Sequence, residues 1–139
     1  MQVFFIGEKG NREKIILPIY GKGLWSTMYG FLALSPDLST IKGITFYSHG
    51  ETPGLGGEID NPSWKKLWAG KKVYDDDFNV LFDIVKGKVP QGVKNFNSKI
   101  DGISGATLTG DGVENTILYW FGKDGFLKFI QNEKRRGSA

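Results

Sequence analysis

The chain has 139 residues and a formal net charge of +3, and 40% of its residues are hydrophobic and 24% charged. These values predict one globular domain over residues 1–139, and the absence of cysteine excludes disulfides, thiolate metal sites and cysteine nucleophiles. Much of the positive charge lies at the tail, in Lys134, Arg135 and Arg136, without a basic stripe elsewhere, so no nucleic-acid partner is expected.

Two strand pairs are predicted in the first fifty residues. The apolar runs Val3–Ile6 and Lys14–Leu17 flank a turn-rich segment and predict a hairpin. Two further runs, Tyr29–Leu34 and Ile41–Tyr47, are joined by Ser35-Pro36-Asp37 and predict a second pair. No apolar run approaches the ~18 residues that span a bilayer, so we expect this chain taken alone to be soluble.

The middle of the chain predicts one short helix and one strand. Asn61 is placed to cap the helix, Pro62 occupies its first turn and Gly70 ends it. Three apolar residues share one face of this helix: Trp64, Leu67 and Trp68. A strand is expected over Asn79–Val85, paired with Lys88–Val93 or with a later segment.

Two helices are predicted near the C-terminus. The first repeats apolar residues at helical spacing, namely Val113, Ile117, Trp120 and Phe121, and Gly122 is placed to end it. Asp124 is expected to cap the second, which directs inward Phe126, Phe129 and Ile130. Because short strands come first and helices are interspersed later, the pattern favours an α+β fold over a doubly wound parallel sheet.

The segment Asp101–Thr109 is the most informative stretch of the sequence. Three small residues, Ser104, Gly105 and Ala106, precede Thr107 at the expected helix start. Small side chains let an anion approach the backbone, and a helix N-terminus favours a phosphate. We expect Thr109 to cap the helix, which leaves Thr107 just outside it with a free hydroxyl. Taken alone, the stretch also fits an ordinary turn into a helix.

A second motif covers residues 49–56, His-Gly-Glu-Thr-Pro-Gly-Leu-Gly. Thr52-Pro53-Gly54 predicts a tight turn, because proline fixes one backbone angle and glycine allows the positive one that follows. The glycines of this segment expose backbone N–H groups without a side chain in the way. An ordinary Gly/Pro loop has the same composition.

Together, the two motifs resemble the FMN-binding domains in the C subunit of the Na+-translocating NADH:quinone reductase and in its Rnf counterpart. The first matches the flavinylation signature Asp-x-x-(Ser/Thr)-Gly-Ala-Thr, and the second the hallmark Glu-Thr-Pro-Gly-Leu-Gly. The resemblance implies a twisted, largely antiparallel sheet with packed helices, and FMN bound through a phosphoester to Thr107. The cofactor-binding residues it implies are Asp101, Ser104, Gly105, Ala106, Thr107, Leu108, Glu51, Thr52, Pro53, Gly54 and Leu55.

A third segment, Tyr20–Ser26, resembles the Gly-x-Gly-Leu-Trp element of the reductase branch rather than the Rnf branch. In this interpretation Trp25 shields the cofactor, although a role in the core fits a lone tryptophan equally well. Leu55 would cover the apolar part of the flavin ring. Glu51 and Thr52 would hydrogen-bond the phosphate-ribityl chain or the polar edge of the ring.

The resemblance also implies how the chain is modified and where it works. A threonine hydroxyl needs an activating base, and the sequence neighbours of Thr107 supply none. A separate Mg2+-dependent flavin transferase would therefore attach the FMN, and protein made without it would carry a bare Thr107. Relatives have an N-terminal membrane helix ahead of the flavin domain, so we expect the flavin domain without its anchor, on the periplasmic face of a bacterial inner membrane. Other membrane subunits of the reductase would be the partners, and no independent catalysis is expected of the isolated domain.

Rival functions have weaker support in the sequence. Ser104 departs from the Gly-x-Ser-x-Gly pattern of a nucleophile elbow, and His49 is the only histidine, which disfavours an imidazole metal site. Asp75-Asp76-Asp77 lacks the spacing of a calcium loop and predicts a solvated acidic turn. Two non-enzymatic alternatives stay open, a module that binds a phosphorylated ligand noncovalently and a structural domain.

Overall fold

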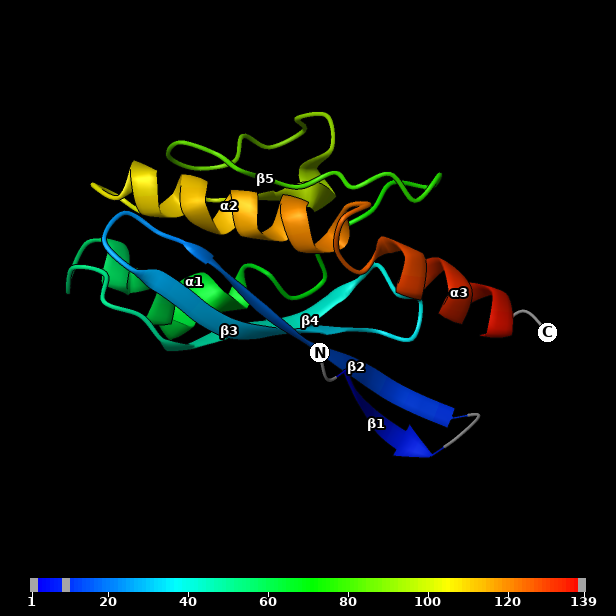
Figure 1. The fold of residues 1–139 in the computed structure, drawn as a ribbon. Coiled ribbons are helices and arrows are strands. Elements are labelled where there is room, and N and C mark those ends of the chain that lie inside the picture. Colours follow the sequence, from blue (N-terminus) through cyan, green and yellow to red (C-terminus); the bar gives the residue numbers. More distant parts are fainter. Residues whose placement is uncertain (1–2, 9–10, 138–139) are drawn as a thin grey trace.

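The computed structural model describes residues 3–8 and 11–137 and has an α+β architecture (Figure 1). Its main sheet is antiparallel, with strands in the order β1-β2-β3-β4. The strands are β1 (Phe4–Glu8), β2 (Asn11–Lys22), β3 (Thr27–Leu34) and β4 (Ile41–Ser48). Both predicted strand pairs are confirmed, and β2 extends beyond its prediction to Lys22. The turn residues Lys9 and Gly10 of the first hairpin lie outside the described residues.

The second half of the chain forms short elements and two longer helices. In chain order they are η1 (Gly56–Asp60), α1 (Pro62–Lys66), β5 (Asp83–Ile84), η2 (Phe96–Ser98), β6 (Lys99–Ile100), α2 (Thr107–Phe121) and α3 (Leu127–Gly137). Helix α2 runs along one face of the sheet, and α3 continues beyond it towards the β1–β2 hairpin (Figure 1). No helix in the described ranges is long and apolar enough to cross a membrane.

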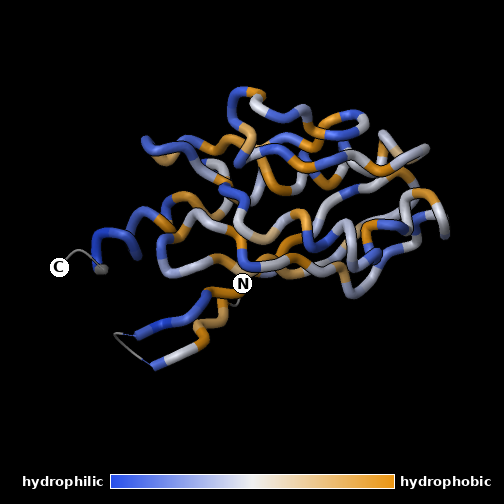
Figure 2. Tube along the Cα trace, turned by 180° about the vertical axis from the view of Figure 1, so that it is seen from behind, coloured by the Kyte–Doolittle hydropathy of each residue, from blue (hydrophilic) through white to orange (hydrophobic). Residues whose placement is uncertain are grey.

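The hydrophobic core lies between the sheet and α2. Along β2 every second residue points into it: Ile15, Leu17 and Ile19 are buried. Val113 and Ile117 of α2 pack against this core and are fully buried. They are four residues apart, the spacing of one helix face. Figure 2 shows hydrophilic residues at the outer ends of β1 and β2 and along the last turns of α3, where the chain leaves this core.

Close packing fixes α2 against β2. A Cβ on Gly112 of α2 would overlap the carbonyl oxygen of Lys22, so only glycine allows this approach. Further along the helix, Trp120 Nε1 donates to the Tyr20 carbonyl at 2.7 Å. The start of α2 is thereby held beside the β2–β3 turn.

The predicted strand over Asn79–Val85 is largely wrong. Only Asp83–Ile84 forms a strand, and it pairs in parallel with the later segment Lys99–Ile100, one of the two kinds of partner that the sequence allows. The alternative partner, Lys88–Val93, forms no strand. Gly87 and Gly92 have φ values of +79° and +74°, so the backbone turns there instead of extending.

The three predicted helices are present, but α1 ends at Lys66 instead of reaching Gly70, and α2 and α3 begin at other residues than predicted. Asn61 caps α1 by accepting from the Ser63 N–H at 2.8 Å, and α2 ends at Phe121, directly before Gly122. Helix α3 begins at Leu127, so Asp124 is not its cap. The chain turns back instead through Gly125, and the Phe126 N–H donates to the Trp120 carbonyl.

Candidate functional site

Thr107 is the first residue of α2, and its side chain is exposed. The N-cap is Ala106, which has no side-chain capping bond, and the first intrahelical bond runs from Gly110 N to the Ala106 carbonyl at 3.0 Å. The N–H groups of residues 107–109 therefore lack carbonyl partners within the helix. An exposed hydroxyl thus stands at a helix N-terminus that is suited to an anion.

Thr109 does not cap α2, contrary to the prediction from the sequence. It lies inside the first turn, is buried, and donates from Oγ1 to Glu51 Oε1 at 2.8 Å. The capping expectation failed because the hydroxyl finds a carboxylate from a distant loop, which local sequence does not reveal. Thr107 consequently belongs to the helix rather than preceding it, and its hydroxyl stays accessible.

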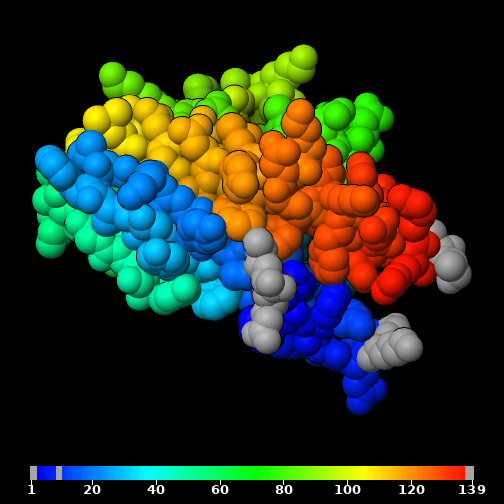
Figure 3. All heavy atoms as spheres, viewed as in Figure 1, coloured from blue at the N-terminus to red at the C-terminus, as the bar shows by residue number. Residues whose placement is uncertain are grey.

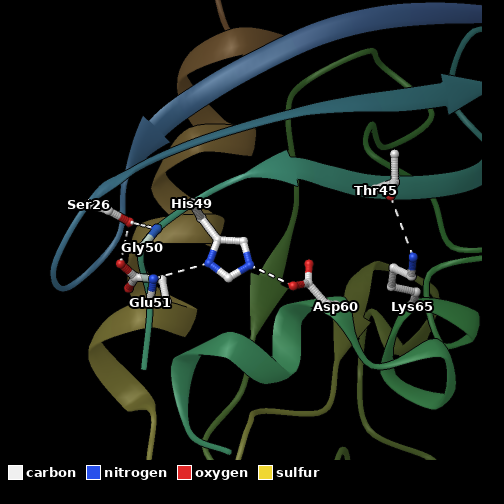
Figure 4. Close-up of polar contacts among 7 residues, drawn as sticks. All are labelled: Ser26, Thr45, His49, Gly50, Glu51, Asp60 and Lys65. Carbon is white, nitrogen blue, oxygen red and sulfur yellow. Dashed lines mark hydrogen bonds and ion pairs between the residues drawn. The ribbon is translucent and has the colours of Figure 1, made fainter. Parts of the chain in front are cut away.

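Glu51 connects the second motif with two other segments. Its carboxylate accepts from the Leu24 N–H at 2.7 Å, the Trp25 N–H at 3.1 Å and the Ser26 hydroxyl at 2.7 Å, in addition to Thr109. Figure 4 shows Glu51 beside Ser26, whose hydroxyl also accepts from the Gly50 N–H at 2.8 Å. Four protein donors therefore occupy the two oxygens of this carboxylate.

Hydrogen bonding outweighs desolvation at this carboxylate. Burial by itself raises the pKa of Glu51, but the bonds from Ser26, Thr109, Leu24 and Trp25 favour the charged form, so the pKa lies below its ordinary value. The segments that contain Trp25, Glu51 and Thr109 therefore meet around a fixed negative charge.

The turn of the second motif packs directly against the loop of residues 101–107. The Thr52 carbonyl accepts from the N–H groups of Leu55 and Gly57 at 3.0 and 2.8 Å, which closes the turn. A Cβ on Gly105 would lie 3.0 Å from the Leu55 side chain, and Gly105 has a φ of +71°. Thr52 and Pro53 are exposed on the outside of the same turn. The two motifs, about fifty residues apart in sequence, are thus in contact.

A groove of about 720 Å³ opens beside Thr107. One wall is the acceptor loop, 101–107, and the floor includes apolar side chains of Trp64, Leu67, Ile84 and Ile103. The segment 84–88, which is hydrogen-bonded to residues 100–102, also lines the groove and contributes Lys86 and Lys88. The sequence analysis missed these two lysines, because they stand in an unremarkable turn around Gly87 and only the fold brings them to the groove.

Asp101 joins three segments that line the groove. Its Oδ1 accepts from the Val89 N–H at 2.8 Å, and its carbonyl accepts from Trp64 Nε1 at 2.9 Å. The next residue, Gly102, donates its N–H to the Gly87 carbonyl at 2.8 Å. These bonds tie the start of the loop 101–107 to the segment 87–89 and to α1.

Exposed apolar side chains gather at the end of the molecule that holds Thr107. Trp25 is 70% exposed, which rules out the core role that the sequence left open, and Leu55 and Leu108 are 45% and 60% exposed. Figure 3 shows the start of α2 (yellow), the β2–β3 turn (blue) and the 51–60 loop (cyan to green) together at this end.

His49 and Asp60 fasten the second motif to η1. His49 Nε2 lies 2.7 Å from Asp60 Oδ2, and its Nδ1 accepts from the Glu51 N–H at 3.1 Å (Figure 4). Both ring nitrogens are therefore engaged in holding the loop. The acidic run at 75–77 also has a local role, since Asp75 Oδ1 accepts from the N–H groups of Asp77 and Asn79 and forms a turn.

Comparisons with known proteins agree with this geometry. The model of a family described as the FMN-binding domain matches residues 23–121. The C subunit of the Na(+)-translocating NADH-quinone reductase of Pseudomonas aeruginosa is 52% identical over 138 residues, which are 99% of this chain and 52% of that protein. Its counterpart in Vibrio alginolyticus is 47% identical over 128 residues, 92% of this chain and 49% of that protein. The chain thus spans about half the length of the curated relatives it matches.

Solved structures show the same fold. The crystal structure of Shewanella oneidensis NqrC superposes with a TM-score of 0.87 at 42% identity, covering 96% of this chain and 60% of that one. The C subunit of the Na(+)-translocating NADH-quinone reductase from Parabacteroides distasonis gives a TM-score of 0.77 at 36% identity, covering 92% and 61%.

Proposed function

The chain belongs to the family of FMN-binding domains, and from that membership we propose that it carries FMN covalently on Thr107 as an electron-transfer domain. The observation that carries this proposal is the place of Thr107. Its exposed hydroxyl stands in the first turn of α2, at the edge of a groove of about 720 Å³. That volume lies in the range of pockets that hold cofactor-sized ligands.

The residues around the groove suit the parts of a flavin nucleotide. A phosphate on Thr107 Oγ1 would face the free N–H groups of the first turn and the positive end of the helix, a stabilisation of about 0.3–1 kcal/mol in exposed geometry. Lys86 and Lys88, which also line the groove, add positive charge. Leu55 and the apolar floor provide contact for a planar ring. When bound, the flavin accepts and donates electrons, while the chain supplies attachment, orientation and electrostatic tuning.

Attachment would require a separate flavin transferase that uses FAD and Mg2+. In that step Thr107 Oγ1 forms a bond to the FMN phosphorus, the pyrophosphate P–O bond breaks, and AMP leaves with the electron pair. The hydroxyl proton passes to a base on the transferase. The exposed position of Thr107 leaves room for an enzyme to reach it.

At the level of the whole assembly, we propose that the domain is part of the C subunit of a sodium-translocating NADH:quinone reductase. Relatives of that name include proteins that are 44–52% identical to this chain. The domain would pass electrons between redox centres of neighbouring membrane subunits on the periplasmic side of a bacterial inner membrane. An Rnf-type electron-transport subunit is the alternative within the family.

A Thr107→Ala variant tests the proposal directly. When it is co-expressed with a flavin transferase, intact-mass analysis should show no FMN adduct and a denaturing gel no fluorescent band. Wild-type protein and Thr107→Ser should gain the adduct, because both keep a hydroxyl at this position. Thr45→Ala, on the exposed side of β4, serves as a control and should be labelled like wild type.

Noncovalent binding is the second candidate, since the same groove and helix N-terminus can hold a free phosphorylated ligand. Acid precipitation separates the two cases. Flavin that stays in the supernatant after precipitation of labelled wild-type protein contradicts covalent attachment, whereas a coloured pellet that disappears in Thr107→Ala supports it.

A further inference from the structure

One buried carboxylate joins the two loops that border the attachment residue. Glu51 Oε1 accepts from the Leu24 N–H and the Thr109 hydroxyl, and Oε2 accepts from the Trp25 N–H and the Ser26 hydroxyl. We call these five residues the Glu51 cluster. Glu51 is 4% exposed and Thr109 1%, so water is largely excluded from the bonds between them.

Two glycines leave the space in which the cluster closes. A side chain on Gly23 would overlap Glu51 Oε1, and one on Gly56 would overlap Thr109 Oγ1. The segments that contain Gly23 and Gly56 thus come close enough for these hydrogen bonds because neither has a side chain at the point of contact.

The cluster demands a group that only accepts hydrogen bonds. All four partners donate, and within residues 3–8 and 11–137 Glu51 forms no ion pair. A carboxylate offers two oxygens with about four acceptor sites, whereas the amide of glutamine offers one oxygen and two N–H donors. Each oxygen faces one backbone N–H, which cannot accept, and one hydroxyl, which can. Glutamine would therefore leave one buried backbone N–H facing another donor, which is costly.

Building on the proposed function, we propose that Glu51 is a positioning residue for flavin attachment. It fixes the loop of residues 24–26, which carries Trp25, relative to the first turn of α2, which carries Thr107. Thr109 lies in the same helical turn as Thr107, two residues on, so the bond to Glu51 holds the backbone that presents the acceptor hydroxyl. The other oxygen holds the amide on which the exposed Trp25 is mounted. The hydrogen-bond donors to the carboxylate are Leu24, Trp25, Ser26 and Thr109, so it acts on Thr107 through the backbone of the helix.

A Glu51→Gln variant tests this role with two readouts. Flavin attachment by the transferase, followed by intact mass, should slow about tenfold. This is the effect expected from the loss of about one net hydrogen bond. Amide hydrogen exchange at Leu24 and Trp25 should become faster, in the flavin-free protein as well. The matched control is Glu58→Gln in η1, where the carboxylate accepts from the Asn61 side chain at 2.9 Å, and it should behave like wild type.

A pair of variants at Thr109 separates positioning from general damage to the fold. Thr109→Ser keeps the hydroxyl and should retain the wild-type attachment rate, whereas Thr109→Val removes it and should slow attachment with Leu24 and Trp25 exchange near wild type. This pair decides the matter even if Glu51→Gln fails to fold. Equal attachment rates for Thr109→Ser and Thr109→Val, or a folded Glu51→Gln protein labelled at the wild-type rate, would overturn the inference.

The inference and the proposed function fail in different ways. If wild-type protein takes no flavin on Thr107, the proposed function is wrong, and amide exchange at Leu24 and Trp25 still reports whether the cluster orders the loop. If wild-type protein is labelled and neither readout changes in Glu51→Gln, only the positioning role is wrong.

Discussion

At the scale of single residues, the acceptor loop depends on a glycine at position 105. Gly105 adopts a φ of +71°, in the region where an L side chain costs about 1–2 kcal/mol. Its Cα also faces Leu55, whose Cδ2 would lie 3.0 Å from an added Cβ. A side chain at position 105 would therefore both strain the backbone and collide with Leu55 of the other motif.

Gly105→Ala should therefore lower the free energy of unfolding by about 1–2 kcal/mol and also slow flavin attachment, because Leu55 must move. Gly70→Ala is the matched control: its φ is +88°, but no atom lies within 4 Å of an added Cβ. It should lose similar stability in urea titrations and keep the attachment rate. Equal attachment rates for both variants would show that the Leu55 contact is irrelevant.

A second residue-scale feature is the carboxyl pair formed by Asp83 and Glu114 behind the groove wall. Glu114 Oε1 accepts from the Ile84 N–H at 2.6 Å, and Lys99 Nζ lies 2.9 Å from Asp83 Oδ2. Burial, then the hydrogen bond and charge of Asp83, raise the pKa of Glu114 to about 7. The bonds from Glu114 and Lys99 lower the pKa of Asp83, so the pair keeps one proton, on Glu114.

This proton makes stability depend on pH in a defined direction. The pKa of Glu114 rises on folding from its ordinary value of 4.5 to about 7, so the folded state binds the proton more tightly. That contribution is complete below pH 4.5 and is lost as the pH rises through 7. Glu114→Gln should flatten the decline of the free energy of unfolding between about pH 5 and 8, as measured by urea titrations. An equally steep decline in the variant would contradict the assignment.

At the scale of elements, the close packing of α2 on β2 predicts opposite effects on stability when two glycines of α2 are replaced by alanine. Gly112 faces the Lys22 carbonyl oxygen with no room for a Cβ, whereas a Cβ on Gly110 would meet Ile84 Cγ2 at an ordinary 3.5 Å. Helix propensity alone favours alanine over glycine by about 1 kcal/mol at both positions.

Gly110→Ala should accordingly raise the free energy of unfolding by up to about 1 kcal/mol, and Gly112→Ala should lower it by about 1–3 kcal/mol, because the helix must move away from the sheet. Thermal or urea unfolding of the two variants measures the difference. Stabilisation by both substitutions would mean that α2 lies farther from β2 than the structure shows.

The elements also show what the sequence can and cannot predict. Alternating residues such as Ile15, Leu17 and Ile19 and the helical repeat of Val113 and Ile117 are local patterns, and they predict the corresponding elements. The segment 79–93 also suggests a strand locally, but that prediction is largely wrong, because its conformation follows from tertiary contacts such as the hydrogen bond from Val89 to Asp101. The same holds for the site. The motifs locate Thr107, but the bond of Thr109 to Glu51 spans 58 residues and has no local signal.

At the scale of the whole molecule, the candidate site and the β1–β2 hairpin lie at opposite ends (Figure 1). The central strand β3 is paired on both sides, and Met28, Leu32 and Leu34 in it are fully buried. By contrast, β1 is an edge strand with Phe4 45% exposed, and it contacts α3 through Phe5 and Phe129, whose ring centroids are 6.3 Å apart. The two ends should therefore open independently.

Removing the ring that couples β1 to α3 tests this independence. In native-state hydrogen exchange, Phe129→Ala should speed exchange of the β1 and α3 amides, because few buried contacts remain to hold them. Amides of β3 should then change only by the loss of global stability, and flavin attachment at Thr107 should keep its wild-type rate, since the Glu51 cluster is untouched. If exchange of the β3 amides and the attachment rate changed together with exchange of the β1 amides, the domain would open as one cooperative unit. A partner bound at the hairpin would then affect the site around Thr107 through the fold itself.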